Sequence, residues 1–186
     1  RPEPPAVPSR LLHPAHSPLL QILISLHLAA RGIGALHHAA AAVREGRCYL
    51  FPARSGTGKS TLATLLHRSE LFRVLGDDRI FTRQHGSEFA GYGTPWVSTA
   101  RLCENLSAPL GAIVFLNQAP HTRLEPIARA EAVRRMLPVT DIPWWEPQIT
   151  DSLLGYLDGL VSTVPAFVLH FAPTPDVAGV LAGALP

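Results

Sequence analysis

The stretch that decides the fold is 48-CYLFPARSGTGKSTLATLL-66. Its first four residues are apolar and follow a turn, which is typical of a buried strand. Residues 53–60 are then rich in glycine and hydroxyl side chains, and after them leucines recur at helical spacing. The stretch therefore predicts a strand, a tight glycine loop and a helix, which is the local order of an α/β fold.

The glycine loop, residues 53–60, matches the phosphate-binding pattern G-x-x-x-x-G-K-[ST] except that Ala53 stands at its first position. Glycines let consecutive backbone N–H groups turn towards phosphates, and the following helix adds the positive end of its dipole. Lys59 is the only lysine of the chain. We expect it at the surface of the loop, reaching for the β- and γ-phosphates, with the Ser60 hydroxyl on Mg²⁺.

The loop thus predicts a site for a nucleoside triphosphate, ATP or another, together with Mg²⁺. The alternative is a chance glycine pattern in an ordinary strand–turn–helix unit. The apolar strand before the loop and the helix after it favour the binding site. The residues expected around the phosphates are Ser55, Gly56, Thr57, Gly58, Lys59, Ser60 and Thr61.

Two adjacent carboxylates, Asp77 and Asp78, follow a second apolar segment at residues 72–75. In phosphate-loop enzymes an acidic residue at the carboxyl end of a strand holds Mg²⁺ or activates the attacking group. Neighbouring carboxylates also repel each other, so at least one should face a cation or a hydrogen-bond donor. A plain Gly-Asp-Asp turn is the alternative, but the position after a strand favours a functional pair.

Histidine and arginine side chains offer further groups for phosphate chemistry. His37 and His38 precede the strand of the glycine loop, and either could orient a phosphate or the substrate. A histidine among alanines equally suits a buried structural role. Most arginines are solvated surface residues, so no single one is favoured as a phosphate clamp. The candidates are Arg101, Arg123, Arg134 and Arg135.

Composition and charge limit the class of protein. The chain has 186 residues, 47% of them apolar and 16% charged, which favours one compact domain. The net charge is +2 and the arginines are scattered, so neither nucleic acid nor an anionic membrane is expected as a partner. Cys48 and Cys103 have no metal-binding spacing, and we interpret them as buried thiols in a reducing compartment, the cytoplasm.

The chain is expected to consist of a proline-rich arm at residues 1–18 and one catalytic domain at residues 19–186. Residues 18–32 predict a core-facing helix that is too short and too polar to span a bilayer. Further elements are expected as a hairpin at 79–97, strands at 110–116 and 166–171, and helices at 128–136, 144–160 and 175–185. Trp144 and Trp145 are interpreted as packing residues, and core packing is also favoured for Trp96, with residues 93–96 shaping an acceptor pocket as the alternative.

Residues 36–66, LHHAAAAVREGRCYLFPARSGTGKSTLATLL, together with VLGDDRI at 74–80, resemble the catalytic domain of HPr kinase/phosphorylase and its kinase-like relatives. That family is structurally akin to ATP-dependent phosphoenolpyruvate carboxykinase. Residues 93–120 are similar to relatives described only as HPr kinase-like, rather than to the bifunctional enzymes. The resemblance implies an α/β fold with a P-loop core, a mixed central sheet and flanking helices.

The resemblance also implies roles for individual residues. It makes His38 the active-site histidine and places Lys59 and Ser60 on phosphates and metal. It makes Asp77 the catalytic base and Asp78 its partner near the metal. The chain departs from the family in having Ala53 for a glycine and in lacking a clear counterpart of the glycine-rich signature with a metal-binding glutamate. The second departure puts phosphorolysis and the usual protein substrate in question.

These features predict ATP-dependent phosphoryl transfer to a hydroxyl of a protein, a peptide or a small molecule such as serine. Assembly into a homo-oligomer is a further expectation from the resemblance. Two other classes stay open: a nucleotide-binding regulatory module or weak ATPase, and a carboxykinase-like lyase. Acceptor-dependent ADP release separates the kinase from the module, and activity with oxaloacetate identifies the lyase.

Overall fold

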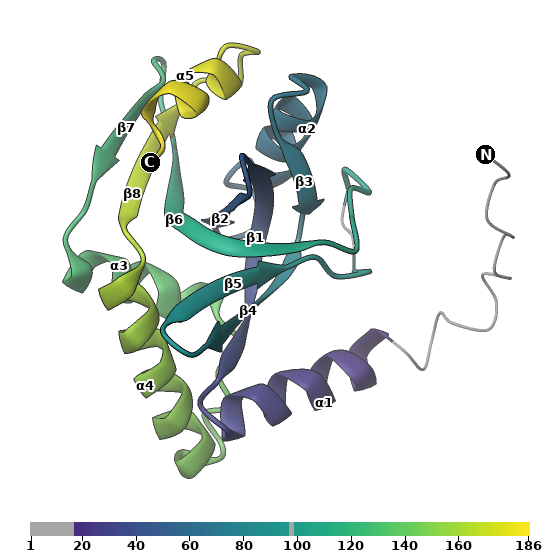
Figure 1. Cartoon of the computed structure of the whole chain (residues 1–186), viewed down its shortest axis with the longest axis vertical. Coiled ribbons are helices and arrows are strands. Elements are labelled where there is room, and N and C mark those ends of the chain that lie inside the picture. Colours follow the sequence, from purple (N-terminus) through teal and green to yellow (C-terminus); the bar gives the residue numbers. More distant parts are fainter. Residues whose placement is uncertain (1–16, 97–98) are drawn as a thin grey trace, which may run out of the picture.

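The computed structural model of the chain describes residues 17–96 and 99–186 (Figure 1). Helices and strands interleave along these residues, and the strands form one eight-stranded sheet. The proline-rich arm expected at residues 1–18 lies outside the described residues, except that residues 17 and 18 already belong to the first helix. The predicted α/β fold, with a mixed central sheet and flanking helices, is confirmed.

The elements follow one another in a mixed order of strands and helices. The strands are β1 (Gly34–Arg44), β2 (Arg47–Pro52), β3 (Arg73–Gly76), β4 (Arg79–His85), β5 (Glu88–Tyr92), β6 (Ser107–Gln118), β7 (Arg123–Pro126) and β8 (Ala166–Phe171). The helices are α1 (Ser17–Ala30), α2 (Lys59–Arg68), α3 (Arg129–Met136), α4 (Pro147–Thr163) and α5 (Val177–Ala184), with a 3-10 turn η1 (Leu137–Val139) after α3.

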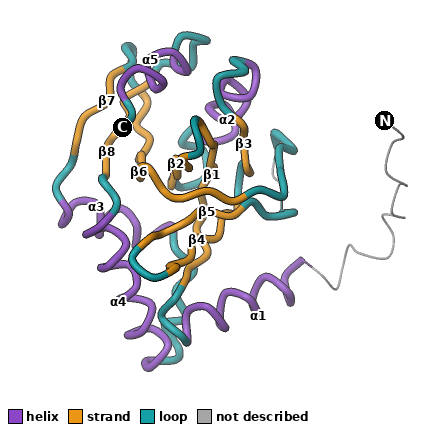
Figure 2. The backbone as a smooth tube through the Cα atoms, in the orientation of Figure 1, coloured by secondary structure: helices purple, strands orange, loops and turns teal. Residues whose placement is uncertain are grey.

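The sheet is mixed and curls back on itself. β2, β6 and β8 run parallel to one another, and every other pairing within the described strands is antiparallel. The first residues of β6 pair with β5, its middle residues 110–113 pair with β2, and residues 113–118 pair with β8. Because β2 also pairs with β1, the strands β1, β4, β5, β6 and β2 form a closed ring of hydrogen-bonded neighbours, gathered at the centre of Figure 2.

Helices cover both faces of this sheet. α3 and α4 pack against one face, and α2 and α5 pack against the other. Side chains along β1 alternate accordingly: Ala39 and Ala41 lie in the core under α4, whereas Ala40 and Ala42 lie in the core under α2. Because both faces are buried, β2 and the second half of β6 read as nearly continuous apolar runs.

Closure of the ring leaves no room for a side chain at Gly91 of β5. A Cβ added there would lie 2.6 Å from Sγ of Cys48 on β2, which is closer than two such atoms approach in folded proteins. Cys48 is completely buried, and burial raises the pKa of its thiol to about 12. Cys48 is therefore a neutral packing residue, as its apolar surroundings in the sequence predicted.

Most predicted elements are present, with boundaries within a few residues of those expected, but β7 was missed. Its four residues, RLEP, contain one apolar side chain, and the strand lies at the edge of the sheet, mostly exposed. An edge strand of this kind lacks the apolar alternation by which strands are recognised.

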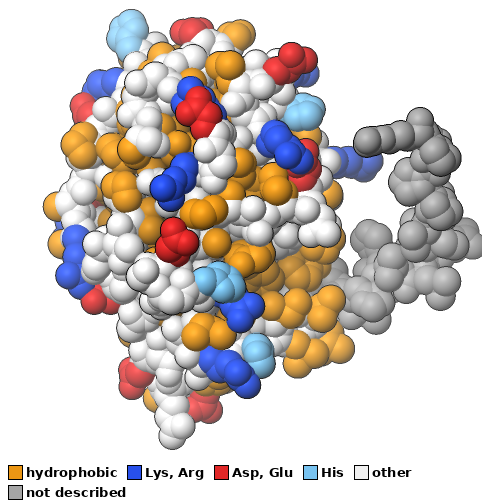
Figure 3. Space-filling view, viewed as in Figure 1, with side chains coloured by type: hydrophobic (Ala, Val, Ile, Leu, Met, Phe, Trp, Pro, Cys, Tyr) orange, Lys and Arg blue, Asp and Glu red, His pale blue; other side chains and the backbone are white. Residues whose placement is uncertain are grey.

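α1 confirms the predicted helix at residues 18–32, but the prediction that its apolar side faces the core holds only for its C-terminal part and was wrong for its first turns. Its C-terminal part packs inwards through Leu28 and Ala29. The large side chains of its first turns are between 42% and 57% exposed: Leu19, Leu20, Ile22 and Leu23. Figure 3 shows apolar atoms gathered in the lower right of the view, where α1 lies in Figure 1. Spacing identified an apolar helix, but it could not reveal that no other described element covers these turns.

The predicted burial of individual tryptophan and cysteine residues was confirmed in some cases and wrong in others. Trp96 packs edge-on against Phe81, with ring centroids 5.9 Å apart, as predicted. Trp144 and Trp145 are not packing residues, since they are 64% and 76% exposed in the turn before α4. Cys103 is also exposed rather than buried. Residue type alone predicted burial in these cases, whereas the loops that carry the residues lie at the surface.

Within residues 17–96 and 99–186 no helix combines the length and the apolarity needed to cross a bilayer.

Gly91→Ala tests the closure of the ring. We expect a loss of about 1–3 kcal/mol in the free energy of unfolding, measured by urea denaturation, because the methyl group overlaps Sγ of Cys48. Gly179→Ala is the control, because open space surrounds Gly179 in α5 and the change should be neutral or slightly stabilising. In a Cys48→Ala background the cost of Gly91→Ala should shrink; an unchanged cost there would contradict the proposed overlap.

Candidate functional site

The glycine loop joins β2 to α2 at the edge of the sheet where the parallel strands β2, β6 and β8 have their carboxyl ends. Ligands of open α/β sheets bind at this edge. Gly56 and Gly58 have φ angles of 81° and 103°, in the left-handed region that favours glycine. A Cβ on Gly58 would also lie 2.9 Å from the ring of Phe171 on β8. Both conformation and space thus require glycine at residue 58.

Ala53 causes no strain at the first position of the loop. Its φ is not positive, because the only non-glycine residues with positive φ in the described chain are Glu45, Glu70 and Arg101. Ala53 is buried, and its N–H donates a hydrogen bond of 3.2 Å to the carbonyl of His38 on β1. The departure from the glycine pattern is therefore compatible with the loop geometry.

The N-terminus of α2 is arranged to attract an anion. Its N-cap is Gly58, which has no side chain to accept the first N–H groups, and the first turn contains no acidic residue. The helix dipole therefore places partial positive charge at this end of α2, with no acidic side chain in the first turn to offset it. Ser60 is partly exposed and Thr61 is exposed in this turn, while Ser55 and Gly56 are exposed in the loop before it. Thr57 donates its hydroxyl hydrogen to the carbonyl of Arg54, which tightens the loop.

Lys59 lies inside the loop rather than on its surface, which corrects the sequence-based expectation. The residue is only 6% exposed, and its Nζ donates hydrogen bonds to the carbonyls of Ala53 at 2.8 Å and Arg54 at 3.1 Å. Burial lowers the pKa of its ammonium, while the charges of Asp78 and, more weakly, Asp77 oppose that shift. Its side chain folds back because the carbonyls of the loop are the nearest acceptors.

Asp78 forms an accessible ion-pair cluster beside the loop. Its carboxylate lies 3.2 Å from Nε2 of His38 on β1 and 3.5 Å from Nε of Arg79 on β4, and its side chain is 25% exposed. Burial is the main cause that lowers the pKa of His38, Lys59 lowers it further, and Asp78 raises it. The Asp78 carboxylate and the His38 imidazole thus lie close to two cations, Arg79 and Lys59. Sequence reasoning did not single out Arg79.

Asp77 is placed differently from its neighbour. It is completely buried, and its Oδ2 accepts a hydrogen bond of 2.9 Å from the N–H of Ala100. The negative charge of Asp77 raises the pKa of the Lys59 ammonium, against the larger lowering that burial causes. The structure therefore brings His38, Lys59, Asp77 and Asp78 together, with Asp78 exposed to solvent and Asp77 beneath it.

His37 has a structural role that the sequence left open. It is fully buried on the α4 side of β1, with Nδ1 3.0 Å from Oγ1 of Thr140 and Nε2 2.8 Å from Oγ1 of Thr82. Thr140 donates its own hydrogen to the Met136 carbonyl, so it accepts from Nδ1–H of His37. Tyr156 donates to Thr82, so the Thr82 hydroxyl donates to Nε2.

This chain of hydrogen bonds requires neutral His37 with its proton on Nδ1. Burial lowers the pKa of the imidazole to about 3, which agrees with a neutral ring. Through Thr140 the chain ties β1 to the end of α3 and η1, which are the elements beside the glycine loop. Of the two adjacent histidines, His38 therefore faces the candidate site and His37 braces it.

The arginines predicted as phosphate clamps separate into two groups. Arg134 and Arg135 of α3 line a hollow of about 280 Å³ that begins at the glycine loop. Arg123 instead pairs with Glu125 on the edge strand β7, with Nε 2.7 Å from Oε1. Arg101 is exposed in the connection between β5 and β6. Proximity to the loop thus favours the two arginines of α3.

A second hollow, of about 330 Å³, lies on the α2 side of the loop. Its lining residues are Ser60, Thr61, Thr64, Leu65, Arg68, Thr99 and Ala100. Because Ala100 donates to Asp77, this hollow borders the buried carboxylate. The glycine loop therefore has one hollow towards α3 and another beside α2.

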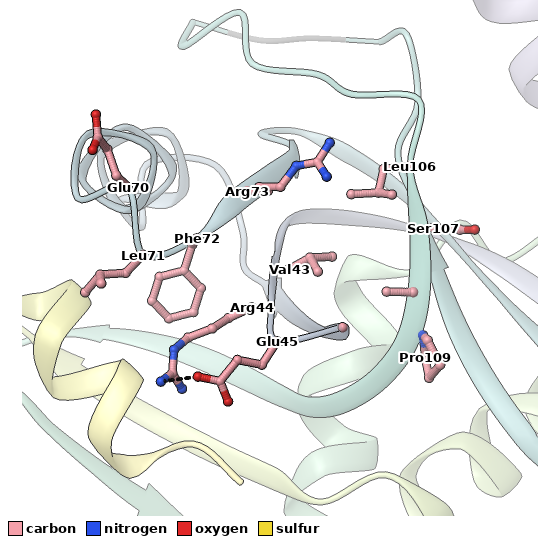
Figure 4. Close-up of a pocket in the computed structure, with 12 residues that line it drawn as sticks. Val43, Arg44, Glu45, Glu70, Leu71, Phe72, Arg73, Leu106, Ser107 and Pro109 are labelled. Atoms are coloured by element: carbon pink, nitrogen blue, oxygen red, sulfur yellow. Dashed lines mark ion pairs between the residues drawn. The ribbon is translucent and has the colours of Figure 1, made fainter.

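Figure 4 shows a different and larger hollow, of about 450 Å³, between β3 and the start of β6. Phe72 and Pro109 line it, and an ion pair of 2.7 Å joins Arg44 and Glu45 at its rim. It lies at the C-terminal end of β1, beyond His38, and near the first residues of β2 and β6. Neither the helix N-terminus nor the paired aspartates line it, so we do not include it in the candidate site.

The described residues contain no group of three or more histidine, cysteine or acidic side chains that could hold a metal ion by themselves. Ser60 at the start of α2 and the partly exposed carboxylate of Asp78 place oxygen atoms at this edge of the sheet.

No protein-family model and no curated protein matches this chain. Among solved structures, it is similar to the Hpr(Ser) kinase/phosphatase from Coxiella burnetii, with 14% sequence identity and a TM-score of 0.45. The match covers 80% of this chain and 94% of that one. Values this low indicate no more than a distant relationship in fold.

The buried neutral state of His37 predicts a pH dependence of stability. The pKa of His37 is about 3 when folded and its ordinary value is 6.5, so between these pH values the unfolded chain binds the additional proton. Stability should therefore fall as the pH falls from about 6.5, by about 1.4 kcal/mol per pH unit from this residue.

His37→Gln is the matched variant, since glutamine keeps a donor and an acceptor but does not titrate. Urea unfolding at several pH values between 4 and 7 should give a shallower slope for the variant than for the wild type. Equal slopes would show that His37 is not buried in its neutral form.

Proposed function

We propose that this chain is a P-loop phosphotransferase, which binds a magnesium–nucleoside triphosphate, ATP or another, at residues 53–60 and transfers the γ-phosphoryl group to a hydroxyl acceptor. The observation that carries the proposal is the uncapped N-terminus of α2 at the carboxyl ends of parallel strands, with Lys59 and the pair Asp77–Asp78 beside it. A triphosphate has the charge that this helix end attracts, and the adjacent carboxylates supply what transfer to a hydroxyl requires.

The loop and Lys59 would hold the phosphates. The N–H groups at the start of α2 point outwards from the helix end, where they can donate to phosphate oxygens. The Lys59 ammonium has three N–H donors and uses two of them on the carbonyls of Ala53 and Arg54. The third donor can contact a phosphate without any change in the other two. The loop thus positions the ammonium before the nucleotide arrives.

Magnesium would be held by the hydroxyl of Ser60 and the carboxylate of Asp78, with phosphate oxygens and water completing its shell. When bound, the ion supplies neutralisation of the charge that builds up on the transferred phosphoryl group. Nε2 of His38 and Nε of Arg79 lie 3.2 Å and 3.5 Å from the Asp78 carboxylate, so these two residues would help to orient it.

In the transfer step the acceptor oxygen forms a bond to the γ-phosphorus, the bond to the β–γ bridging oxygen breaks, and the nucleoside diphosphate leaves. The acceptor proton passes to one of the two adjacent carboxylates. The family resemblance implies that Asp77 is this base, and Ala100, whose N–H donates to Asp77, lines the hollow beside α2. Asp78, which is partly exposed and lies 3.2 Å from Nε2 of His38, is the other candidate.

The complete burial of Asp77 favours one alternative, a nucleotide-binding regulatory module or weak ATPase that has no acceptor. Incubation of the chain with γ-labelled ATP in a lysate of the source organism distinguishes the two. A kinase should release ADP in an acceptor-dependent way and label a lysate component. Binding of ATP without any labelled component would favour the module.

Lys59→Met should weaken binding of Mg-ATP at least tenfold, since a charge-assisted hydrogen bond to phosphate is lost. Isothermal calorimetry measures the affinity, and circular dichroism checks that the variant is folded. Arg83→Met is the control, because it removes one positive charge from an exposed residue of β4 away from the loop. Unchanged ATP affinity in a folded Lys59→Met variant would contradict the P-loop assignment.

The two aspartates should differ in their effects. If Asp77 is the base, Asp77→Asn should lower the rate of transfer about 10²–10⁴-fold and leave the affinity for ATP close to that of the wild type. Asp78→Asn should instead raise the concentration of Mg²⁺ required. The reverse pattern would assign the base to Asp78, and near-normal turnover of both variants would place the active site elsewhere.

A further inference from the structure

The hollow between the glycine loop and α3 has a chemistry that phosphate binding does not explain. Its floor is apolar, formed by Phe115 and Leu116 of β6 and by Pro138 and Val139 of η1. Its sides carry Arg134 and Arg135, and its loop end is lined by residues 52–54 and Thr57. A phosphate chain needs no apolar floor, so the hollow fits a ligand with an anionic end and a flat apolar end.

Charge in this hollow is positive and held in place. Arg134 and Arg135 both pair with one carboxylate, Glu131, at 2.6 Å each. Arg54 also lines the hollow, which therefore has three guanidinium groups, and Glu131 pairs with two of them. The excess of positive charge lies next to the loop, where it complements a polyphosphate.

Arg135 provides a flat surface within the hollow. Its guanidinium carbon lies 5.9 Å from the centroid of the Phe115 ring, so the ring supports the guanidinium from one side. Phe115 is only 3% exposed, whereas the side chain of Arg135 is 39% exposed. A planar ligand can therefore stack on Arg135, since guanidinium groups stack on aromatic rings and nucleobases.

We propose that this hollow takes the nucleoside of the triphosphate, with its base stacked on Arg135. The inference rests on the proposed function, and it places the nucleoside on the α3 side of the loop and the acceptor on the α2 side. The hollow beside α2 contains no aromatic residue and one cation, Arg68, and it borders Asp77. In-line transfer requires the leaving diphosphate and the attacking hydroxyl on opposite sides of the γ-phosphorus. With the nucleoside towards α3, the acceptor enters beside α2.

Arg135→Lys tests the stacking surface, because lysine keeps the positive charge but has no flat group. Calorimetry should show that the variant binds Mg-ATP about tenfold more weakly than the wild type, the range expected for one lost base stack. Its affinity for magnesium tripolyphosphate, which has no base, should be unchanged. Arg129→Lys is the matched control on the same helix, since Arg129 pairs with Asp158 and does not line the hollow.

The outcomes separate this inference from the proposed function. If the wild type binds neither Mg-ATP nor tripolyphosphate, the proposed function itself fails. If it binds both equally well, or if Arg135→Lys weakens both equally or neither, the site is a phosphate site without a nucleoside subsite here. Photolabelling with 8-azido-ATP gives a second measurement: label within residues 115–139 supports the proposal, and label within residues 60–68 or 99–101 overturns it.

Discussion

The left-handed conformation of Gly58 is the constraint on which the candidate site depends. With φ at 103°, Gly58 turns the chain from the glycine loop into α2 and brings the loop against the ring of Phe171. Any side chain at this position would be strained by its φ and would also meet Phe171. Because glycine has no side chain, the N–H groups at the start of α2 have no cap there. One residue therefore fixes both the path of the loop and its attraction for an anion.

The curled sheet adds the side chains that surround this helix end. β1 pairs with β2 along one edge and with β3 and β4 along the other, so the residues before the loop and those after β3 lie on either side of the same strand. His38 of β1 and Asp78, just after β3, consequently lie 3.2 Å apart and close to Lys59. His37, which faces the opposite side of β1, braces the strand against η1 through Thr140. Of these two adjacent residues, one therefore faces the candidate site and the other stabilises the strand behind it.

Much of this arrangement could be predicted from the sequence, because it is local. The apolar run at residues 48–51, the glycines and the amphipathic helix define the loop, and the pair Asp77–Asp78 follows a strand. What could not be predicted depends on distant contacts. The roles of His37 and His38 follow from which face of β1 each occupies. The proximity of Arg134 to the loop depends on the packing of α3.

Exposure of individual residues was the hardest feature to predict, because it too depends on contacts between distant parts of the chain. An apolar sequence predicts burial, yet Trp145 and the first turns of α1 lie on the surface because no described element packs over them. The edge strand β7 has no apolar pattern, since one side of it has no neighbour in the sheet. Burial of Lys59 likewise follows from its hydrogen bonds to backbone carbonyls of the loop. The direction of these carbonyls cannot be predicted from the order of residue types.

The central claim is that the glycine loop and the first turn of α2 bind the phosphates of a nucleotide. The most direct measurement is a titration of the ¹⁵N-labelled chain with Mg-ADP, followed by the amide signals in two-dimensional NMR spectra. The account predicts that the largest shifts fall on the amides of residues 55–61, with smaller shifts at the hollow lined by α3. Unchanged amides in the loop, or shifts confined to the hollow between β3 and β6 in Figure 4, would contradict it.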